Sequence, residues 1–247
     1  MATIGTEEPQ AIAVAEAIRQ EIPLPWAASS NDDALLDRLG RCFTGPTPPT
    51  PEEVNSAFWG ACHGQQPSDR IEVVAHDPAW TTRFAELGRD LRAGLGDVAL
   101  RIDHIGSTSV PGLAAKPIID LQISVAAFEP LEAFKDPLER LGYVYRADNP
   151  ERTKRYFREP PGRPRTHVHV RRAGSFSEQW ALLFRDYLRA HAEVAAEYAA
   201  LKRQLAARFR DDRRAYLDAK GPFLWEVMRL ADGWAQAEGW RPGPSDA

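Results

Sequence analysis

The segment from Arg101 to Val125, RIDHIGSTSVPGLAAKPIIDLQISV, joins a turn of small polar residues to an apolar strand with one carboxylate. The turn is formed by a glycine and three hydroxyl residues, Gly106, Ser107, Thr108 and Ser109. Glycine lets backbone N–H groups approach an anion closely, and hydroxyls add further donors. A nearby carboxylate, here Asp120, can hold the metal ion that accompanies nucleotide phosphates. The segment therefore predicts a strand, a turn and a second strand that together bind an anionic group.

The second of these strands has two chemically different faces. Its apolar residues Ile119, Leu121, Ile123 and Val125 alternate with Asp120, Gln122 and Ser124. Alternate residues of a strand point to the same side, so Asp120 and Gln122 face one cleft. A carboxylate in so apolar a strand is costly unless it is paired or coordinated. We assign Asp120 to metal binding, with a buried salt bridge as the alternative; Gln122 can add an amide oxygen but no charge.

A second strand with two faces is expected at THVHV, residues 166–170. Val168 and Val170 share one face, whereas His167 and His169 share the other. Neutral imidazole binds metals and protonated imidazole donates to phosphate, so both histidines are candidate metal ligands. The alternative is that they only form hydrogen bonds on a polar sheet face.

Two basic residues near these strands are candidates for neutralising phosphate charge. Lys116 lies just before the strand of Asp120, and Arg155 lies on a short strand expected at residues 155–158. A solvated lysine and a solvated basic sheet edge are the alternatives.

Charge divides the chain into two unlike parts. Residues 1–70 carry a net charge of −6, and residues 71–247 carry +2. Neither value is basic enough to predict nucleic acid as a partner. The proline-rich stretch GPTPPTP, residues 45–51, favours an extended segment between short helices. We expect residues 1–70 to form a small acidic helical appendage that either docks a protein partner or is an inert remnant, and residues 71–240 to form the main domain.

The main domain is expected to alternate strands with helices and to end in helices alone. Strands are predicted at 71–77, 98–102, 118–125, 143–145, 155–158 and 166–170, with helices after Asp77–Pro78 and at 131–141. From Ser177 onward the period is helical, which indicates a C-terminal helical cap. The fold class is therefore α+β. No apolar run is long enough to cross a membrane and the N-terminus is acidic, so a cytoplasmic location is expected.

Five motifs, HIGSTSVPGLAAKPIIDLQISV, THVHV, FRDYLR, YAALKRQL and YLDAKGPFL, resemble the GrpB family over about residues 71–234. This family is viewed as a branch of the nucleotidyltransferase superfamily, which implies a mixed sheet flanked by helices. The resemblance further implies that Gly106 and Ser107 hold nucleotide phosphates and that Asp120 binds a divalent metal. Lys202, in YAALKRQL, joins the phosphate-binding set through the same resemblance. Gln122 stands where the superfamily has a second acid.

Shorter fragments within residues 22–66 resemble pieces of an ankyrin-type repeat protein, although the regular period of about 33 residues is missing.

These observations predict a Mg²⁺-dependent nucleotidyltransferase-like enzyme that uses ATP or another NTP to modify or activate a small acceptor. The expected catalytic residues are Asp120, Gln122 and His169. The expected phosphate-binding residues are Gly106, Ser107, Thr108, Ser109, Lys116, Arg155 and Lys202. The expected metal ligands are Asp120, His167 and His169. The alternative, which Gln122 favours, is an inactive nucleotide- or CoA-type ligand-binding or chaperone-like module; a hydrolase that uses Ser107 or Ser109 ranks last because the GxSxG pattern is missing.

Overall fold

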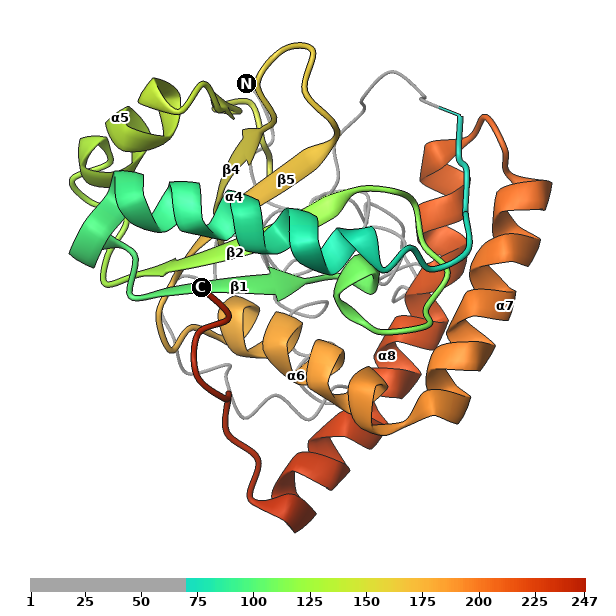
Figure 1. The fold of residues 1–247 in the computed structure, drawn as a ribbon. Coiled ribbons are helices and arrows are strands. Elements are labelled where there is room, and N and C mark those ends of the chain that lie inside the picture. The colour runs from blue at the N-terminus through green and yellow to red at the C-terminus, as the bar shows by residue number, and fades with distance from the viewer. Residues whose placement is uncertain (1–69) are drawn as a thin grey trace, which may run out of the picture. The chain divides into compact units, whose positions relative to one another are not determined.

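The computed structural model describes residues 70–247 (Figure 1). The expected N-terminal appendage and its ankyrin-like fragments lie outside the described residues. Within residues 70–247, no helix has both the length and the apolar character needed to cross a membrane.

The centre of the fold is one five-stranded mixed sheet in the order β1-β2-β5-β4-β3. Its strands are β1 (Arg101–Ile105), β2 (Ile119–Val125), β3 (Val144–Tyr145), β4 (Arg155–Arg158) and β5 (Thr166–Arg172). β2 and β5 run parallel, whereas the other neighbours are antiparallel. The predicted α+β fold with a mixed sheet flanked by helices is confirmed, and it is consistent with a nucleotidyltransferase-like fold.

Helices α4 (Ala79–Leu95) and α5 (Glu132–Arg140) cover the apolar face of the sheet. Leucine and aromatic side chains of α4 pack against the odd-numbered residues of β2 and against the two valines of β5. In Figure 1, α4 crosses in front of the strands. This layer holds the main hydrophobic core, and burial of its apolar surface is the chief stabilising contribution to such a fold.

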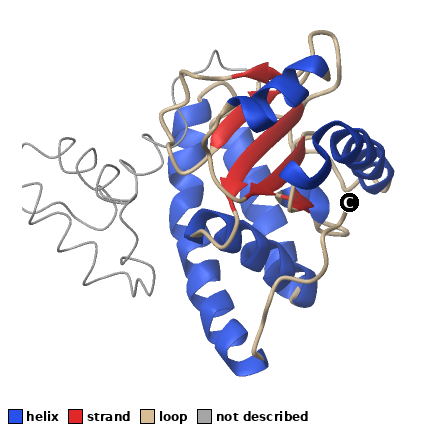
Figure 2. Cartoon of the chain, turned by 90° about the vertical axis from the view of Figure 1, so that its left-hand side faces the viewer, coloured by secondary structure: helices blue, strands red, loops and turns tan. Residues whose placement is uncertain are grey.

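Helices α6 (Phe176–Ala190), α7 (Ala192–Arg208) and α8 (Arg213–Glu238) form the second helical layer, and Figure 2 shows the sheet between helices. α6 contacts the polar face through hydrogen bonds: the hydroxyl of Ser124 donates to the carboxylate of Glu178, and Nε2 of Gln122 donates to the Glu178 carbonyl at 3.3 Å. α7 and α8 lie side by side and contact each other. The predicted C-terminal helical cap is thus confirmed.

The segment before the sheet departs from the prediction in two places. Residues 71–77 form only an isolated bridge, between Val74 and Ala115, instead of a strand. β1 begins at Arg101 because α4 continues to Leu95 and Gly96, at φ +53°, starts a short 3₁₀ turn. The predicted start of α4 is confirmed, since the Asp77 carboxylate accepts a hydrogen bond from the Ala79 N–H at 2.9 Å.

The C-terminal segment lies along the outer edge of β1. Ser245 Oγ and the Asp246 carboxylate accept hydrogen bonds from the N–H groups of Ile102 and His104, at 2.8 and 2.9 Å. The N–H of Ala247 donates to the Ile102 carbonyl at 3.1 Å. These contacts cover an edge strand that would otherwise offer free backbone groups to other chains.

Candidate functional site

The candidate site is centred on Asp120 of β2 and on two histidines of β5. Parallel pairing places Asp120 opposite His167 and Gln122 opposite His169, so these side chains share one face of the sheet. Oδ1 of Asp120 lies 3.0 Å from Nδ1 of His167 and 3.4 Å from Nε2 of His169. The Asp120 side chain is 28% exposed, so a ligand can reach it. The structure thus brings together all three of the predicted metal ligands.

Burial and hydrogen bonding set the charge of these three groups. Burial raises the pKa of Asp120, but hydrogen bonds with His167 and His169 outweigh it and hold that pKa well below its usual value. Burial lowers the pKa of both histidines, and for His169, with the charge of Lys154, it lowers the pKa to about 3. At neutral pH the group therefore holds one carboxylate and two neutral imidazoles.

Gly106 lets the polar turn lie directly against Asp120. Its backbone has φ +70° and ψ −174°, a conformation that essentially only glycine adopts. A Cβ atom built on Gly106 would lie 2.6 Å from Oδ2 of Asp120. The predicted association of the turn with the carboxylate is therefore present in the structure.

The three hydroxyls of the turn have different partners. The Thr108 hydroxyl donates to the Ile118 carbonyl at 3.0 Å and lies 3.0 Å from Nε2 of His104. Ser109 Oγ donates to the Gly106 carbonyl at 2.6 Å. The Ser107 hydroxyl is half-buried and lies near the hydroxyl of Tyr198 of α7. The side chains of Thr108 and Ser109 thus hold the turn, whereas none of these contacts involves Ser107.

Three lysines surround two tyrosine rings beside this turn. We call these lysines, which are Lys116, Lys202 and Lys220, the lysine cluster. The ammonium groups of Lys116 and Lys220 lie 5.9 and 5.2 Å from the ring centroid of Tyr216. The Lys202 ammonium lies 4.3 Å from the ring centroid of Tyr198, the same tyrosine that lies near Ser107. The cluster therefore joins the segment before β2 to helices α7 and α8.

The lysine cluster lacks neutralising partners close enough to offset its burial. Burial and, to a smaller extent, neighbouring cations lower the pKa of Lys116 to about 7, of Lys202 to about 6 and of Lys220 to about 8, although the charge of Asp120 partly opposes the shift of Lys116 and Lys220. Lys202 is only 3% exposed, and its Nζ has no hydrogen-bond partner among the described residues. Buried polar groups normally have partners, so Lys202 marks a place where an anion would fit.

Gln122 is more deeply buried than expected for a residue that faces a ligand-binding cleft. It is fully buried, its Oε1 accepts a hydrogen bond from Arg171 at 2.6 Å, and its Nε2 donates to α6. The structure thus places Gln122 on the same face as Asp120 but commits its amide to the packing of α6.

Arg155 is the one predicted residue that the structure places away from the others. The guanidinium lies 4.2 Å from the ring centroid of Phe128 and 3.8 Å from the Glu129 carboxylate, on the opposite face of the sheet from Asp120. Because side chains alternate along a strand, Tyr156 lies on the polar face instead of Arg155. The centroid of its ring lies 5.6 and 5.3 Å from those of His167 and His169.

The donor chemistry of the group fits Mg²⁺ poorly. Mg²⁺ requires an octahedral set of oxygen ligands. The candidate group within residues 70–247 offers one carboxylate and two imidazoles, and the oxygen of Gln122 is already used. A set of this kind suits divalent transition metals better. Mg²⁺ binding therefore stays a prediction, and the set of donor atoms does not favour it.

Sequence reasoning missed Tyr198, Tyr216 and Lys220 as parts of this site. Tyr198 and Tyr216 are both buried, as aromatic residues of a helical core usually are. Tyr216 and Lys220 are four residues apart on α8 and therefore lie on one helical face. That spacing within YLDAKGPFL was a usable signal, but their neighbours Lys116 and Tyr198 come from distant parts of the chain.

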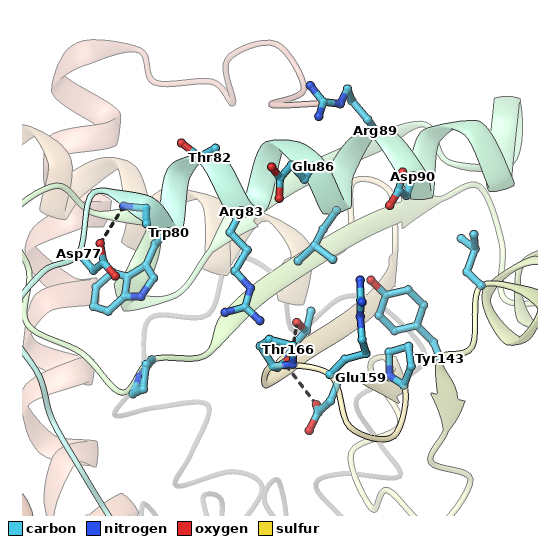
Figure 3. Close-up of a pocket in the computed structure, with 17 residues that line it drawn as sticks. Asp77, Trp80, Thr82, Arg83, Glu86, Arg89, Asp90, Tyr143, Glu159 and Thr166 are labelled. Carbon is cyan, nitrogen blue, oxygen red and sulfur yellow. Dashed lines mark hydrogen bonds between the residues drawn. The ribbon is translucent and has the colours of Figure 1, made fainter.

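A large cavity of about 1180 Å³ lies elsewhere in the fold, between α4 and the connection from β4 to β5 (Figure 3). Its lining carries both signs of charge, including Arg83 and Glu86 of α4 and Glu159 of the connection. Hydrogen bonds from Arg158 and Thr166 outweigh burial and lower the pKa of Glu159 to about 2. Asp120 and the lysine cluster do not line this cavity, so the candidate site rests on its chemistry and not on cavity size.

The mixed sheet, with its glycine–serine turn against a strand carboxylate, defines an α+β protein of nucleotidyltransferase-like fold. The chain belongs to the GrpB family, since the family model described as GrpB protein matches residues 70–230. The crystal structure of the conserved protein GrpB from Enterococcus faecalis is similar, with a TM-score of 0.60 and 36% identity, over 66% of this chain and 99% of that one.

Three curated relatives illustrate the range of names in the family. The UPF0157 protein PA4798 of Pseudomonas aeruginosa is 40% identical over 193 residues, which cover 76% of each chain. A dephospho-CoA kinase of Mycolicibacterium paratuberculosis is 34% identical over 198 residues, which cover 70% of this chain and 48% of the kinase. This chain therefore spans about half the length of the kinase and of the UPF0157 protein YqkA of Bacillus subtilis, which is 36% identical over 168 residues.

Proposed function

We propose that this protein binds a nucleoside triphosphate at the polar face of the sheet and transfers its nucleotidyl group to a small acceptor. The observation that carries this proposal is the convergence of Asp120, the Gly106–Ser107 turn and the lysine cluster, which come from four different parts of the fold. Such an arrangement combines three amines, which a bound anion would keep protonated, and a hydroxyl donor with an ionised carboxylate. Membership in the GrpB family adds support at the level of the fold.

The residues have separate roles in the proposed transfer. The Ser107 hydroxyl and the lysine cluster hold the phosphates and stabilise the charge that develops on the leaving pyrophosphate. The acceptor hydroxyl attacks the α-phosphorus, the bond to pyrophosphate breaks, and Asp120 accepts the hydroxyl proton. His167 and His169 orient the Asp120 carboxylate through their contacts with Oδ1.

A second candidate is a catalytically inactive module that binds nucleotides or CoA-type ligands. The position of Gln122 favours it, because that amide is committed to Arg171 and α6 and leaves Asp120 as the carboxylate of the group. Five relatives of this chain are named dephospho-CoA kinase, but those proteins are about twice as long as the matched segment.

The test compares binding with transfer in the same protein. The chain is incubated with α-³²P-labelled NTPs and a panel of small alcohols, phosphates and CoA precursors, with Asp120→Asn in parallel. The proposal expects a labelled product that the wild-type chain forms and Asp120→Asn does not, while both bind ATP. Binding without any labelled product supports the module, and product formation by Asp120→Asn contradicts the assigned role of Asp120.

A further inference from the structure

We infer that this site binds polyphosphate without a divalent metal, because the lysine cluster supplies the positive charge that a metal would otherwise bring. The inference rests on the proposed function for the identity of the ligand. It concerns a different property, namely what neutralises the phosphates.

The group around Asp120 offers few oxygen atoms that could bind a metal. Magnesium–phosphate sites usually have carboxylate oxygens and waters around the ion. The candidate ligand group of residues 70–247 has a single carboxylate, and Gln122 Oε1 accepts from Arg171. This guanidinium thus occupies the amide oxygen of the residue that stands where a second acid would be expected.

The lysine cluster brings several basic groups together. The charged groups that act most strongly on Lys202 are Lys220, Arg203 and Lys116, all of which are cations. Lys202 is buried, and its Nζ has no hydrogen-bond partner among the described residues. Like charges gathered in a partly buried place are unfavourable unless an anion joins them. The cluster is therefore built for a ligand with several negative charges, such as a triphosphate.

The lysine cluster lies close to the turn that contains Ser107. Lys202 lies against the ring of Tyr198, and the hydroxyl of Tyr198 lies near Ser107 of the turn. Lys116 precedes β2, the strand that carries Asp120. A polyphosphate chain that contacts Ser107 can thus reach the ammonium groups directly, and lysine is well suited to bind phosphate as a point charge.

The experiment is calorimetric titration of the full chain with inorganic tripolyphosphate, in EDTA, in Mg²⁺ and in Mn²⁺. We expect dissociation constants that agree within about threefold across the three conditions. Lys202→Met and Lys220→Met should each weaken binding by about tenfold or more, since methionine keeps the apolar stem and removes the charge. Lys135→Met is the matched control, because Lys135 pairs with Glu139 on the exposed surface of α5.

The variant Asp120→Asn distinguishes most sharply between binding by the lysines alone and binding that requires a metal. If lysines alone hold the ligand, removal of the carboxylate leaves the affinity unchanged or raises it; if a metal is required, the affinity falls. A tenfold loss in EDTA, a tenfold loss in Asp120→Asn, wild-type affinity in both lysine variants, or no binding in any condition would each overturn the inference. Tight binding in EDTA without any nucleotidyl transfer would refute the proposed function while leaving the inference intact.

Discussion

Gly106 and Asp120 approach so closely that a Cβ atom on the glycine would lie 2.6 Å from the carboxylate oxygen Oδ2. The contact joins the two halves of the segment that first indicated a binding site. Register explains it, since Ile105 pairs with Asp120 and the chain turns at the next residue. The carboxylate is therefore positioned by the turn on one side and by two histidines on the other.

Gly106→Ala should be considerably more destabilising than an ordinary glycine substitution. The conformation of Gly106 costs a side-chain-bearing residue about 1–3 kcal/mol, and the clash with Asp120 adds a similar amount. Gly112→Ala is the matched control, because Gly112 has φ +76° but no atom within 4 Å of an added Cβ. Urea unfolding measures both; equal losses of stability would show that the contact with Asp120 is unimportant.

Polyphosphate binding should become weaker as the pH rises from 7 to 9. Before binding, the pKa values of Lys116, Lys202 and Lys220 are lowered to about 7, 6 and 8. A bound anion favours the charged lysines and raises these values, so binding takes up protons in this range. Calorimetry in buffers of different ionisation enthalpy measures the uptake directly. Proton release, or affinity independent of pH, would contradict the lysine cluster as the binding element.

Lys202→Met should stabilise the ligand-free protein near pH 6. The pKa of Lys202 is lower in the folded protein than in the unfolded chain, so the unfolded chain binds more protons between about pH 6 and 10. This difference makes stability rise with pH in that window, and stability is lowest where Lys202 is charged in its buried place. The variant removes the part of this slope that comes from Lys202, whereas the parts that come from Lys116 and Lys220 remain. Urea unfolding at pH 6 and pH 9 compares the two proteins; an unchanged slope in Lys202→Met would exclude Lys202 as its source.

Arg155→Ala should leave tripolyphosphate affinity within about twofold of the wild type. The guanidinium packs on Phe128, on the face of the sheet opposite Asp120. The change should instead reduce stability by about 0.5–1 kcal/mol through loss of the cation–π contact. Titration calorimetry and urea unfolding measure the two effects. A tenfold loss of affinity with unchanged stability would place Arg155 in the binding site after all.

Local alternation was enough to predict much of the sheet. The period of two in β2 and β5 separated Asp120, His167 and His169 from the apolar residues, and the structure confirms that they share a face. The same rule could have excluded Arg155, because Phe157 is fully buried and its neighbour on the same side is Arg155. Sequence reasoning weighed the charge of Arg155 and neglected its parity on the strand.

Other parts of the site depend on contacts between distant segments, which periodicity does not reveal. Lys116 and Lys220 are more than one hundred residues apart, yet both lie near the ring of Tyr216. The commitment of Gln122 to Arg171 likewise depends on how α6 covers the sheet. Several of the candidate residues could be predicted from the sequence, but the lysine cluster could not.

A crystal structure of the full chain with a non-hydrolysable ATP analogue, grown in EDTA, tests the central claim most directly. The account predicts triphosphate density within hydrogen-bonding distance of Ser107 Oγ and the ammonium group of Lys202, beside Asp120. Triphosphate density in the cavity between α4 and the β4–β5 connection, with the lysine cluster free of ligand, would contradict it.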